Sequence, residues 1–371
     1  MRPFEFERQR LDKECRRCGR CASECLFLQN NGAPGVLASQ MTSPQRTSEL
    51  AFCCSLCGLC AAVCPNGCKP VDMFRTARVE SAARGLRPAR QHRRLTTYEK
   101  IGMSRLFSLS LLPENCSTVF FPGCALPGIR PSTTLRTFRK LQELLPDIGI
   151  VLDCCGEPSR TCGLDRQFQA RLQELMDHFT SNGIKRLVLA CPGCLKLFGD
   201  VSSGFEVTSV YQLMAQRPGN LGANPRTAAV HDSCITRDQT EVHDAVRSLL
   251  NQASVEEKSL PHNGSNTLCC GECGAVKFVE PDLAENWRIR RLGEIGESPV
   301  VTYCAACLVP LSSGRDAVHL LDLLVSPDQP LKSPFIPFPP LTYLNRLRLK
   351  FQLLRHAPEG SVRPIVRGLR R

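Results

Sequence analysis

Cysteine spacing near the start of the chain constrains this protein more than any other feature of its sequence. Two runs with the spacing Cys-x2-Cys-x2-Cys-x3-Cys lie within residues 15–64, and proline follows the last cysteine of the second run. Three thiols spaced three residues apart on a tight loop can reach one inorganic core, but the loop cannot fold back far enough for the fourth to close the cage. The runs are Cys15, Cys18, Cys21 and Cys25, and Cys54, Cys57, Cys60 and Cys64.

This spacing is typical of bacterial ferredoxins with two [4Fe–4S] clusters, in which the fourth cysteine of each run ligates the other cluster. We therefore predict two cubane clusters in an α+β, ferredoxin-like domain over residues 1–84, with a loop at 30–48 and a helix at 71–84. The first cluster is expected on Cys15, Cys18, Cys21 and Cys64, and the second on Cys54, Cys57, Cys60 and Cys25.

The total number of cysteines favours metal ligation over disulfides. The 371 residues include 23 cysteines, and a chain of this length buries a sizeable core without covalent crosslinks. The first residues show no apolar run followed by a small-residue cleavage site, so we expect no signal peptide and a cytoplasmic location. In a reducing compartment, cysteines are more often ligands than disulfide partners.

Apolar and basic segments set expectations for the protein surface. No stretch approaches the roughly 20 apolar residues that span a bilayer. The net charge is +12, and a basic tail over residues 327–371, ending in Arg370 and Arg371, carries much of it. We expect this tail either to contact the cytoplasmic face of a membrane peripherally, directly or by docking onto a membrane subunit, or to pack on the protein as an ordinary basic helix. A second basic run at 84–94 offers few aromatic rings for base stacking, so we expect no nucleic acid partner.

The rest of the chain contains an internal duplication. Corresponding cysteines are offset by 110 residues, from Cys124 to Cys234, and by 113 residues, from Cys194 to Cys307. Short β-rich segments alternate with amphipathic helices in both halves, which is typical of α/β domains. We divide the chain into residues 1–84, a linker with one short helix at 85–116, two repeats at 117–218 and 219–326, and a tail at 327–371.

Every cysteine group of the repeats is expected to follow the carboxyl end of a strand. We expect strands at 118–121, 149–152, 187–190, 227–231, 267–268 and 299–303. We expect helices at 132–145, 165–181, 241–251 and 282–295. Because ligand sites gather beyond the carboxyl ends of strands in α/β sheets, five cysteines should converge in each repeat. They are Cys124, Cys154, Cys155, Cys191 and Cys194 in the first, and Cys234, Cys269, Cys270, Cys304 and Cys307 in the second.

Five thiols are one more than a tetrahedral zinc site or a single cubane takes. Gly156 and Gly271 follow the paired cysteines, where the lack of a Cβ would let the backbone approach a bulky core. A single buried cysteine is often only a small core residue, but packing alone does not explain two matched sets. Zinc is the competing metal, although the spacing differs from that of paired zinc-ribbon motifs.

The repeats resemble the paired CCG domains of the heterodisulfide reductase catalytic-subunit family. Their spacing is Cys-x29-Cys-Cys-Gly-x34-Cys-x2-Cys in the first repeat and Cys-x34-Cys-Cys-Gly-x32-Cys-x2-Cys in the second. A two-cluster module followed by two CCG domains is similar to D-type heterodisulfide reductase subunits. It is also similar to iron–sulfur subunits of anaerobic glycerol-3-phosphate dehydrogenase and glycolate oxidase. The resemblance covers residues 10–325 and implies one noncubane [4Fe–4S] cluster on each five-cysteine set.

Some residues depart from this pattern. Cys25 lacks the proline that follows Cys64. Five cysteines lie outside all four sets, and we expect them to be small core or incidental thiols rather than ligands. They are Cys53, Cys68, Cys116, Cys162 and Cys273. Three histidines are candidate proton donors, although histidines near strands and helices are usually structural. They are His231, His243 and His319.

Two redox functions follow from the resemblance. The first is an iron–sulfur electron-transfer subunit of an anaerobic oxidoreductase, which relays electrons between a flavoprotein dehydrogenase, or a membrane quinone- or haem-binding subunit, and an acceptor. The alternative is a catalytic subunit that cleaves a disulfide or another thiol substrate at the CCG clusters, because both cysteine sets are complete. The sequence has no nicotinamide fingerprint and no flavin-phosphate loop, so electrons should arrive from a partner protein. A zinc-binding scaffold without redox activity is the third hypothesis.

Overall fold

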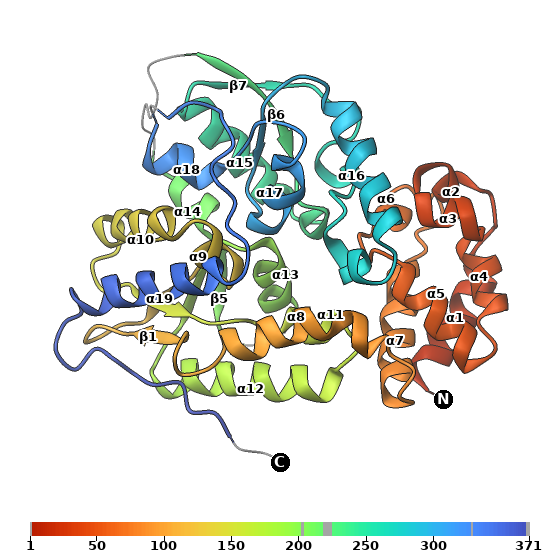
Figure 1. The fold of residues 1–371 in the computed structure, drawn as a ribbon, viewed down its shortest axis with the longest axis horizontal. Helices are drawn as coiled ribbons and strands as arrows, with labels where there is room; N and C mark the ends of the chain where they lie inside the picture. The colour runs from red at the N-terminus through yellow and green to blue at the C-terminus, as the bar shows by residue number, and fades with distance from the viewer. Residues whose placement is uncertain (1, 202–203, 218–224, 328, 369–371) are drawn as a thin grey trace.

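The computed structural model covers most of the chain (Figure 1). It describes residues 2–201, 204–217, 225–327 and 329–368. The expected boundary between the repeats, at residues 218 and 219, lies outside these ranges, as do Arg370 and Arg371. Within the described ranges, no helix combines the length and the apolar composition that a membrane span requires.

The N-terminal module is entirely helical, which corrects the α+β prediction for this part of the chain. No strand occurs in residues 2–108, and the cysteine runs lie on loops and short helices. The expected loop at 30–48 is also wrong, because it contains two helical segments. Its helices begin at Pro34 and Pro44, and proline fits the first turn of a helix although it suggests a loop in the sequence. The helices are α1 (Pro3–Glu14), α2 (Arg20–Glu24), α3 (Leu26–Asn31), α4 (Pro34–Gln40), α5 (Pro44–Cys53), α6 (Leu59–Ala62) and α7 (Pro70–Ala83).

The segment expected to be a linker carries more structure than one short helix. Helix α8 (Ala89–Gly102) has 14 residues, and strand β1 (Leu109–Leu111) pairs antiparallel with a strand of the first sheet. The buried residues of α8 are His92, Glu99 and Gly102. None of them is a large apolar residue, so the helix buries little apolar surface.

The first repeat is a sheet with strand order β1-β3-β2-β4-β5, in which all strands except β1 run parallel. Its strands are β2 (Thr118–Phe121), β3 (Gly149–Leu152), β4 (Arg186–Leu189) and β5 (Glu206–Ser209). Its helices are α9 (Ala125–Ile129), α10 (Pro131–Leu144), α11 (Glu157–Thr161), α12 (Asp165–Ser181), α13 (Pro192–Val201) and α14 (Val210–Ala215). The predicted helix at 165–181 and the predicted strands at 118–121 and 149–152 are confirmed to the residue.

The second repeat is a parallel sheet with strand order β7-β6-β8-β9, which matches the order β3-β2-β4-β5 of the first. The elements are β6 (Arg226–His231), the 3₁₀ helix η1 (Cys234–Thr236), α15 (Thr240–Gln252), β7 (Val255–Lys258), the 3₁₀ helices η2 (Gly264–Asn266) and η3 (Cys273–Phe278), α16 (Pro281–Ile295), β8 (Val300–Thr302), α17 (Ala305–Ser312), β9 (Ala317–His319) and α18 (Leu320–Val325). The shared strand order confirms the duplication. The strand expected at 267–268 is wrong: β7 ends at Lys258, and a loop containing η2 leads from it to Cys269.

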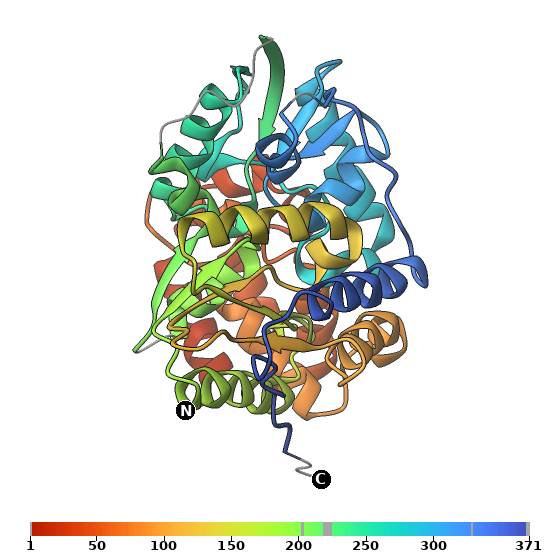
Figure 2. The same cartoon turned by 90° about the vertical axis from the view of Figure 1, so that its left-hand side faces the viewer.

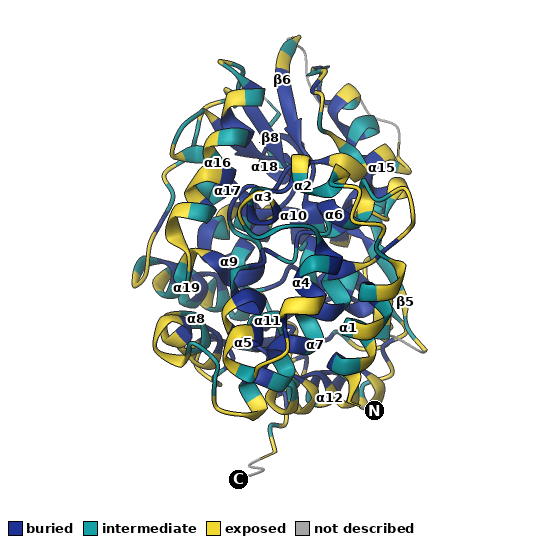
Figure 3. Ribbon diagram, turned by 90° about the vertical axis from the view of Figure 1, so that its right-hand side faces the viewer, coloured by how far each residue is buried: buried dark blue, intermediate teal, exposed yellow. Residues whose placement is uncertain are grey.

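Both sheets are buried between helices, and Figure 3 shows β6 and β8 as a dark-blue layer between α15 and α16. The N-terminal module packs against the second repeat, because its apolar cluster includes Leu268 and Trp287 of that repeat. In the tail, α19 (Leu341–Leu354) packs against α9 and α10 of the first repeat, as Figure 2 shows. The backbone N–H of Arg363 then donates to Ser110 O of β1 at 3.0 Å.

Candidate metal centres

Four cysteines from the two N-terminal runs line a cavity of about 170 Å³, which Cys60 and Cys68 also line. Gly35 lies beside them, and a Cβ at this position would come within 2.9 Å of Cys15 Cβ. A glycine therefore keeps this thiol cage open. We call these four cysteines group A: Cys15, Cys18, Cys21 and Cys64.

The remaining four cysteines of the N-terminal runs lie together in the interior, and all four are buried. Burial raises the pKa of Cys25 to about 12, and the nearby Cys57 adds to this shift. Burial likewise raises the pKa of Cys54 to about 12. Such closely spaced buried thiols cannot all ionise unless a cation compensates their charge, so the site fits a metal core that binds thiolates. We call this set group B: Cys25, Cys54, Cys57 and Cys60.

The loops after β2, β3 and β4 bring together the five cysteines of the first repeat, as predicted. The sulfur of Cys154 contacts those of Cys124 and Cys155, and the sulfur of Cys194 contacts those of Cys155 and Cys191. Contact with Cys154 lowers the pKa of Cys155 to about 7, so part of this set is ready to act as thiolate ligands. We call this set group C: Cys124, Cys154, Cys155, Cys191 and Cys194.

The five cysteines of the second repeat also meet at one edge of their sheet. Cys269 contacts Cys234 and Cys270, and Cys307 contacts Cys270 and Cys304. Contact with Cys269 lowers the pKa of Cys270 well below its usual range, so this repeat also offers a thiolate. We call this set group D: Cys234, Cys269, Cys270, Cys304 and Cys307.

The glycines of the two Cys-Cys-Gly motifs lie close to the helix that follows each motif. Gly271 has φ +92°, and a Cβ there would lie 2.4 Å from Ala284 O in α16. Gly156 has φ +88°, and its Cβ would lie 3.2 Å from the Phe168 ring in α12. Both glycines therefore let the turn pack against the following long helix.

Groups B and D touch one another. The sulfur of Cys57 in group B contacts that of Cys269 in group D. Arg237 fixes the position of this junction, because its Nε donates to Cys57 O at 2.7 Å and its Nη2 donates to Thr267 O at 2.5 Å. The thiols of groups B and D thus join the N-terminal module to the second repeat. Sequence analysis missed Arg237, since its role depends on two segments 180 residues apart.

Groups C and D face one another across a pseudo-twofold arrangement. Helix α9, after Cys124, contacts α17, after Cys304, and helix α13, which contains Cys194, contacts η1, which contains Cys234. Tyr211 spans the junction, where its hydroxyl donates to Tyr303 O at 2.9 Å and its ring packs edge-on against that of Tyr303 at 5.6 Å. Sequence analysis missed both tyrosines, although Tyr303 directly precedes the Cys304 motif.

Among the three candidate histidines, the structure places only His231 among thiols. The nearest ring nitrogen of His231 and the sulfurs of Cys270 and Cys307 all lie within 4.8 Å of one another. His319 instead accepts a hydrogen bond from the backbone N–H of Leu321 at 3.3 Å and caps α18. His243 lies 3.4 Å from the Thr236 hydroxyl. His319 and His243 therefore have structural partners.

Of the five cysteines outside the predicted sets, two contact a thiol of groups A or D and three do not. Cys68 contacts Cys64 of group A, and Cys273 contacts Cys234 of group D, so these two lie closer to the predicted sites than the sequence suggested. The other three lie elsewhere. Cys53 donates to Glu280 at 3.6 Å, Cys116 donates to Thr118 O at 3.2 Å, and Cys162 is fully buried beside α11.

Comparison with known families matches the cysteine-bearing parts of the chain. A 4Fe-4S dicluster domain model matches residues 14–69, and the cysteine-rich domain called CCG matches residues 118–199 and 228–312. The matched segments contain all eighteen predicted ligands. The chain therefore carries an iron–sulfur domain followed by two cysteine-rich domains.

Several characterised proteins are similar to this chain over most of its length. The D-type subunit of the dihydromethanophenazine:CoB–CoM heterodisulfide reductase of Methanosarcina barkeri is 25% identical, over 82% of this chain and 89% of its own length. One subunit of the fumarate reductase (CoM/CoB) of Methanothermobacter marburgensis is 23% identical, over 88% and 72%. The glycolate oxidase iron-sulfur subunit of Escherichia coli is 19% identical, over 86% and 95%.

Proposed function

Because the chain belongs to the CCG-domain iron–sulfur subunits related to the D-type subunits of heterodisulfide reductase, we propose that it relays electrons within an anaerobic oxidoreductase complex. The contact between groups B and D carries this proposal. It joins the thiols of the N-terminal module to those of the second CCG domain. Packing needs alone give a protein no reason to place four thiol sets in succession.

We assign two cubane [4Fe–4S] clusters to groups A and B, and two noncubane [4Fe–4S] clusters to groups C and D. All eighteen ligands are the cysteines named above, and no other residue type is required. When bound, such clusters supply one-electron transfer at potentials set by charge, burial and hydrogen bonds to sulfur. The all-thiol donor sets fit iron–sulfur cores, and the glycine at position 35 in the wall of group A leaves space for one.

Rapid mixing of the anaerobic protein with a reduced viologen tests the relay. Freeze-quenched samples followed by electron paramagnetic resonance (EPR) should show that the clusters of all four groups become reduced without consumption of a disulfide. If the clusters of groups A and B are reduced while those of groups C and D stay oxidised, the relay proposal is wrong.

A reductase is the second candidate function, and one observation favours it. Both five-thiol sets are complete and face one another across the α9–α17 and α13–η1 contacts. A substrate disulfide could therefore meet both sets at once. Adding candidate disulfides to the reduced protein should then reoxidise the clusters and release two thiols per disulfide. Reoxidation without thiol release would contradict this function.

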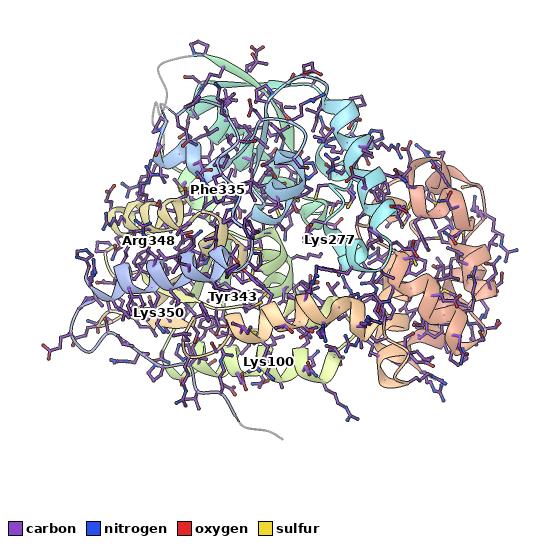
Figure 4. All side chains as sticks on the ribbon, in the orientation of Figure 1. Lys100, Lys277, Phe335, Tyr343, Arg348 and Lys350 are labelled. Carbon is purple, nitrogen blue, oxygen red and sulfur yellow. The ribbon has the colours of Figure 1, made fainter. Side chains whose placement is uncertain are left out.

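We propose that the partner is a flavoprotein dehydrogenase, a membrane quinone- or haem-binding subunit, or both, and that the tail side contacts an anionic membrane surface peripherally. Phe335 is 72% exposed and Leu344 is 60% exposed, which leaves apolar side chains open to solvent. Figure 4 shows Phe335 and the basic Arg348 on the side of the molecule where α19 lies. Apolar and basic side chains on one face suit the surface of an anionic bilayer.

Point substitutions test this contact better than truncation, because the inner face of α19 is buried. We expect Leu344→Ser combined with Phe351→Ser to reduce cosedimentation with vesicles that contain anionic lipid. The cluster content should stay unchanged, since both side chains are exposed. Equal cosedimentation of the variant and the original protein would exclude this contact, and equal binding to zwitterionic vesicles would exclude its preference for an anionic surface.

A further inference from the structure

The two CCG domains differ in the residue that ends their first parallel strand, which is Phe121 in β2 and His231 in β6. Phe121 of β2 pairs in register with Leu189, two residues before Cys191, and His231 of β6 pairs with Thr302, two residues before Cys304. The two residues therefore occupy equivalent places. Phe121 packs edge-on against Phe179 and Phe198 in an apolar layer. The second repeat instead places an imidazole here.

The imidazole of His231 faces the thiols of group D. Its side chain is almost fully enclosed, at 1% exposure, and lies with Cys270 and Cys307 in one compact set whose ligand atoms are within 4.8 Å. Its Nε2 atom has no hydrogen-bond partner, sulfur included, among the described residues. A buried N–H needs an acceptor, and the sulfur of Cys270 lies beside this imidazole.

Arg291 fixes which nitrogen of His231 carries the proton. Its Nε donates to His231 Nδ1 at 3.1 Å, while its other nitrogens donate to Val230 O at 3.1 Å and His262 O at 2.7 Å. A guanidinium can only donate, so Nδ1 must accept and cannot carry a proton. The proton of the imidazole is therefore on Nε2, the nitrogen that is free to point at sulfur.

The same geometry argues against His231 as a metal ligand. A histidine that ligates a metal normally donates its second ring N–H to a carbonyl or carboxylate. In this structure the second nitrogen, Nδ1, instead accepts a hydrogen bond from Arg291. His231 thus has the arrangement of a hydrogen-bond donor to a ligand sulfur.

We propose that His231 donates an N–H···S hydrogen bond to Cys270 and thereby raises the reduction potential of the group D cluster above that of the group C cluster. The proposal rests on the cluster assignment made above. A hydrogen bond to a ligand sulfur offsets the negative charge that reduction adds, so it favours the reduced state. Group C has phenylalanine at the equivalent position and lacks this donor.

This difference gives the two CCG sites different roles. Group D touches group B through Cys57 and Cys269. With the higher potential, the group D cluster holds electrons that arrive from the N-terminal module before they reach group C. His231 is a positioning residue in this scheme, because it acts through Cys270 and not on a substrate.

Redox titration of the anaerobically purified full-length protein, followed by EPR, tests the proposal. We expect His231→Phe, which copies the first repeat, to shift one cluster to a lower midpoint potential and leave the other three unchanged. His231→Gln retains an amide N–H donor and should shift the same cluster less. The matched control is His243→Gln, which changes another buried histidine that contacts no thiol and should shift no cluster.

Three results would overturn the proposal. These are equal potentials in His231→Phe and the original protein, equal shifts in the Phe and Gln variants, and loss of one cluster from both variants. The last result would identify His231 as a ligand. Iron analysis of the original protein separates these outcomes from failure of the cluster assignment. If that assignment is wrong, groups C and D lack iron before any substitution.

Discussion

Gly123 lies between the thiols of group C, at a point where a side chain cannot fit. Its φ is +79°, and a Cβ would lie 2.9 Å from Cys191 Cβ and 3.4 Å from Cys194 Sγ. Two constraints act together here, because the backbone conformation and the space both favour glycine. The residue before a ligand cysteine therefore shapes the site without contributing a donor atom.

We expect Gly123→Ala to remove the group C cluster while the other clusters remain. The methyl group would push Cys191 away from its neighbours, so iron should fall by about four atoms per chain. Gly183→Ala is the matched control, because Gly183 has φ +70° but nothing within 4 Å of the added Cβ. Equal iron loss in both variants would show that backbone strain, and not crowding at the thiols, is responsible.

A second residue-scale feature is the buried guanidinium of Arg78, which joins the module to both repeats. It donates to Cys54 O at 2.6 Å, Thr161 O at 2.8 Å and Gly274 O at 2.8 Å. It also donates to Ala51 O at 2.9 Å, so its loss leaves several buried carbonyls without this donor, at roughly 1–3 kcal/mol for each that finds no other. The side chain therefore holds group B against the CCG domains.

Arg78→Met should lower the free energy of unfolding by at least about 3 kcal/mol, because methionine keeps much of the side-chain volume but donates no hydrogen bonds. Arg84→Met is the control on the following turn, where the partly exposed ion pair with Glu80 is worth about 1 kcal/mol or less. Denaturant titration of both variants measures the difference. Similar losses would mean that Arg78 does not join these parts.

Among the elements, sequence analysis found those with a strong periodic or apolar pattern. The helices α10, α12, α15 and α16 were predicted within two residues, since each buries a regular apolar stripe. Strand β7 was missed because it reads Val-Glu-Glu-Lys at a sheet edge, and only its first residue is buried. Strands β5 and β9 were missed because they are short and directly precede helices.

The cysteine spacing of the second repeat explains why the strand expected at 267–268 is wrong. Its first and second cysteines are separated by 34 residues, compared with 29 in the first repeat. Strand β3 ends two residues before Cys154, whereas β7 ends eleven residues before Cys269. The extra residues form the loop with η2, and no periodic pattern marks where such a loop begins.

The candidate site could be predicted to the level of cysteine sets but not to the contacts between them. The cysteines come together in the four predicted sets, and their role as ligands remains a prediction. The position of Cys273, the contact of Cys57 with Cys269, and the tyrosine pair at the C–D junction all depend on packing between distant segments. Spacing along a chain does not contain that information.

Helix α19 offers an element-scale prediction about the tail. Leu349 is fully buried on its inner face, whereas Leu344 is 60% exposed. Leu349→Ala should lower the free energy of unfolding by about 2–5 kcal/mol, because it leaves a cavity against the first repeat. Leu344→Ala should change it by no more than about 0.5 kcal/mol. Equal effects in denaturant titrations would mean that α19 is not packed as described.

The whole molecule places its thiol groups in the order A, B, D and C. The N-terminal module is docked on the second repeat through Arg237 and the buried Trp287, and the second repeat faces the first through Tyr211 and Tyr303. This order makes the second CCG domain the junction of the molecule. The duplication has therefore produced two similar sites with different neighbours.

The central claim is that these cysteines bind four iron–sulfur clusters, and metal analysis of the full-length protein purified without oxygen tests it most directly. We predict about 16 iron atoms and a similar amount of acid-labile sulfide per chain, together with EPR signals on reduction. A colourless preparation, or one that contains zinc in place of iron, would contradict the claim.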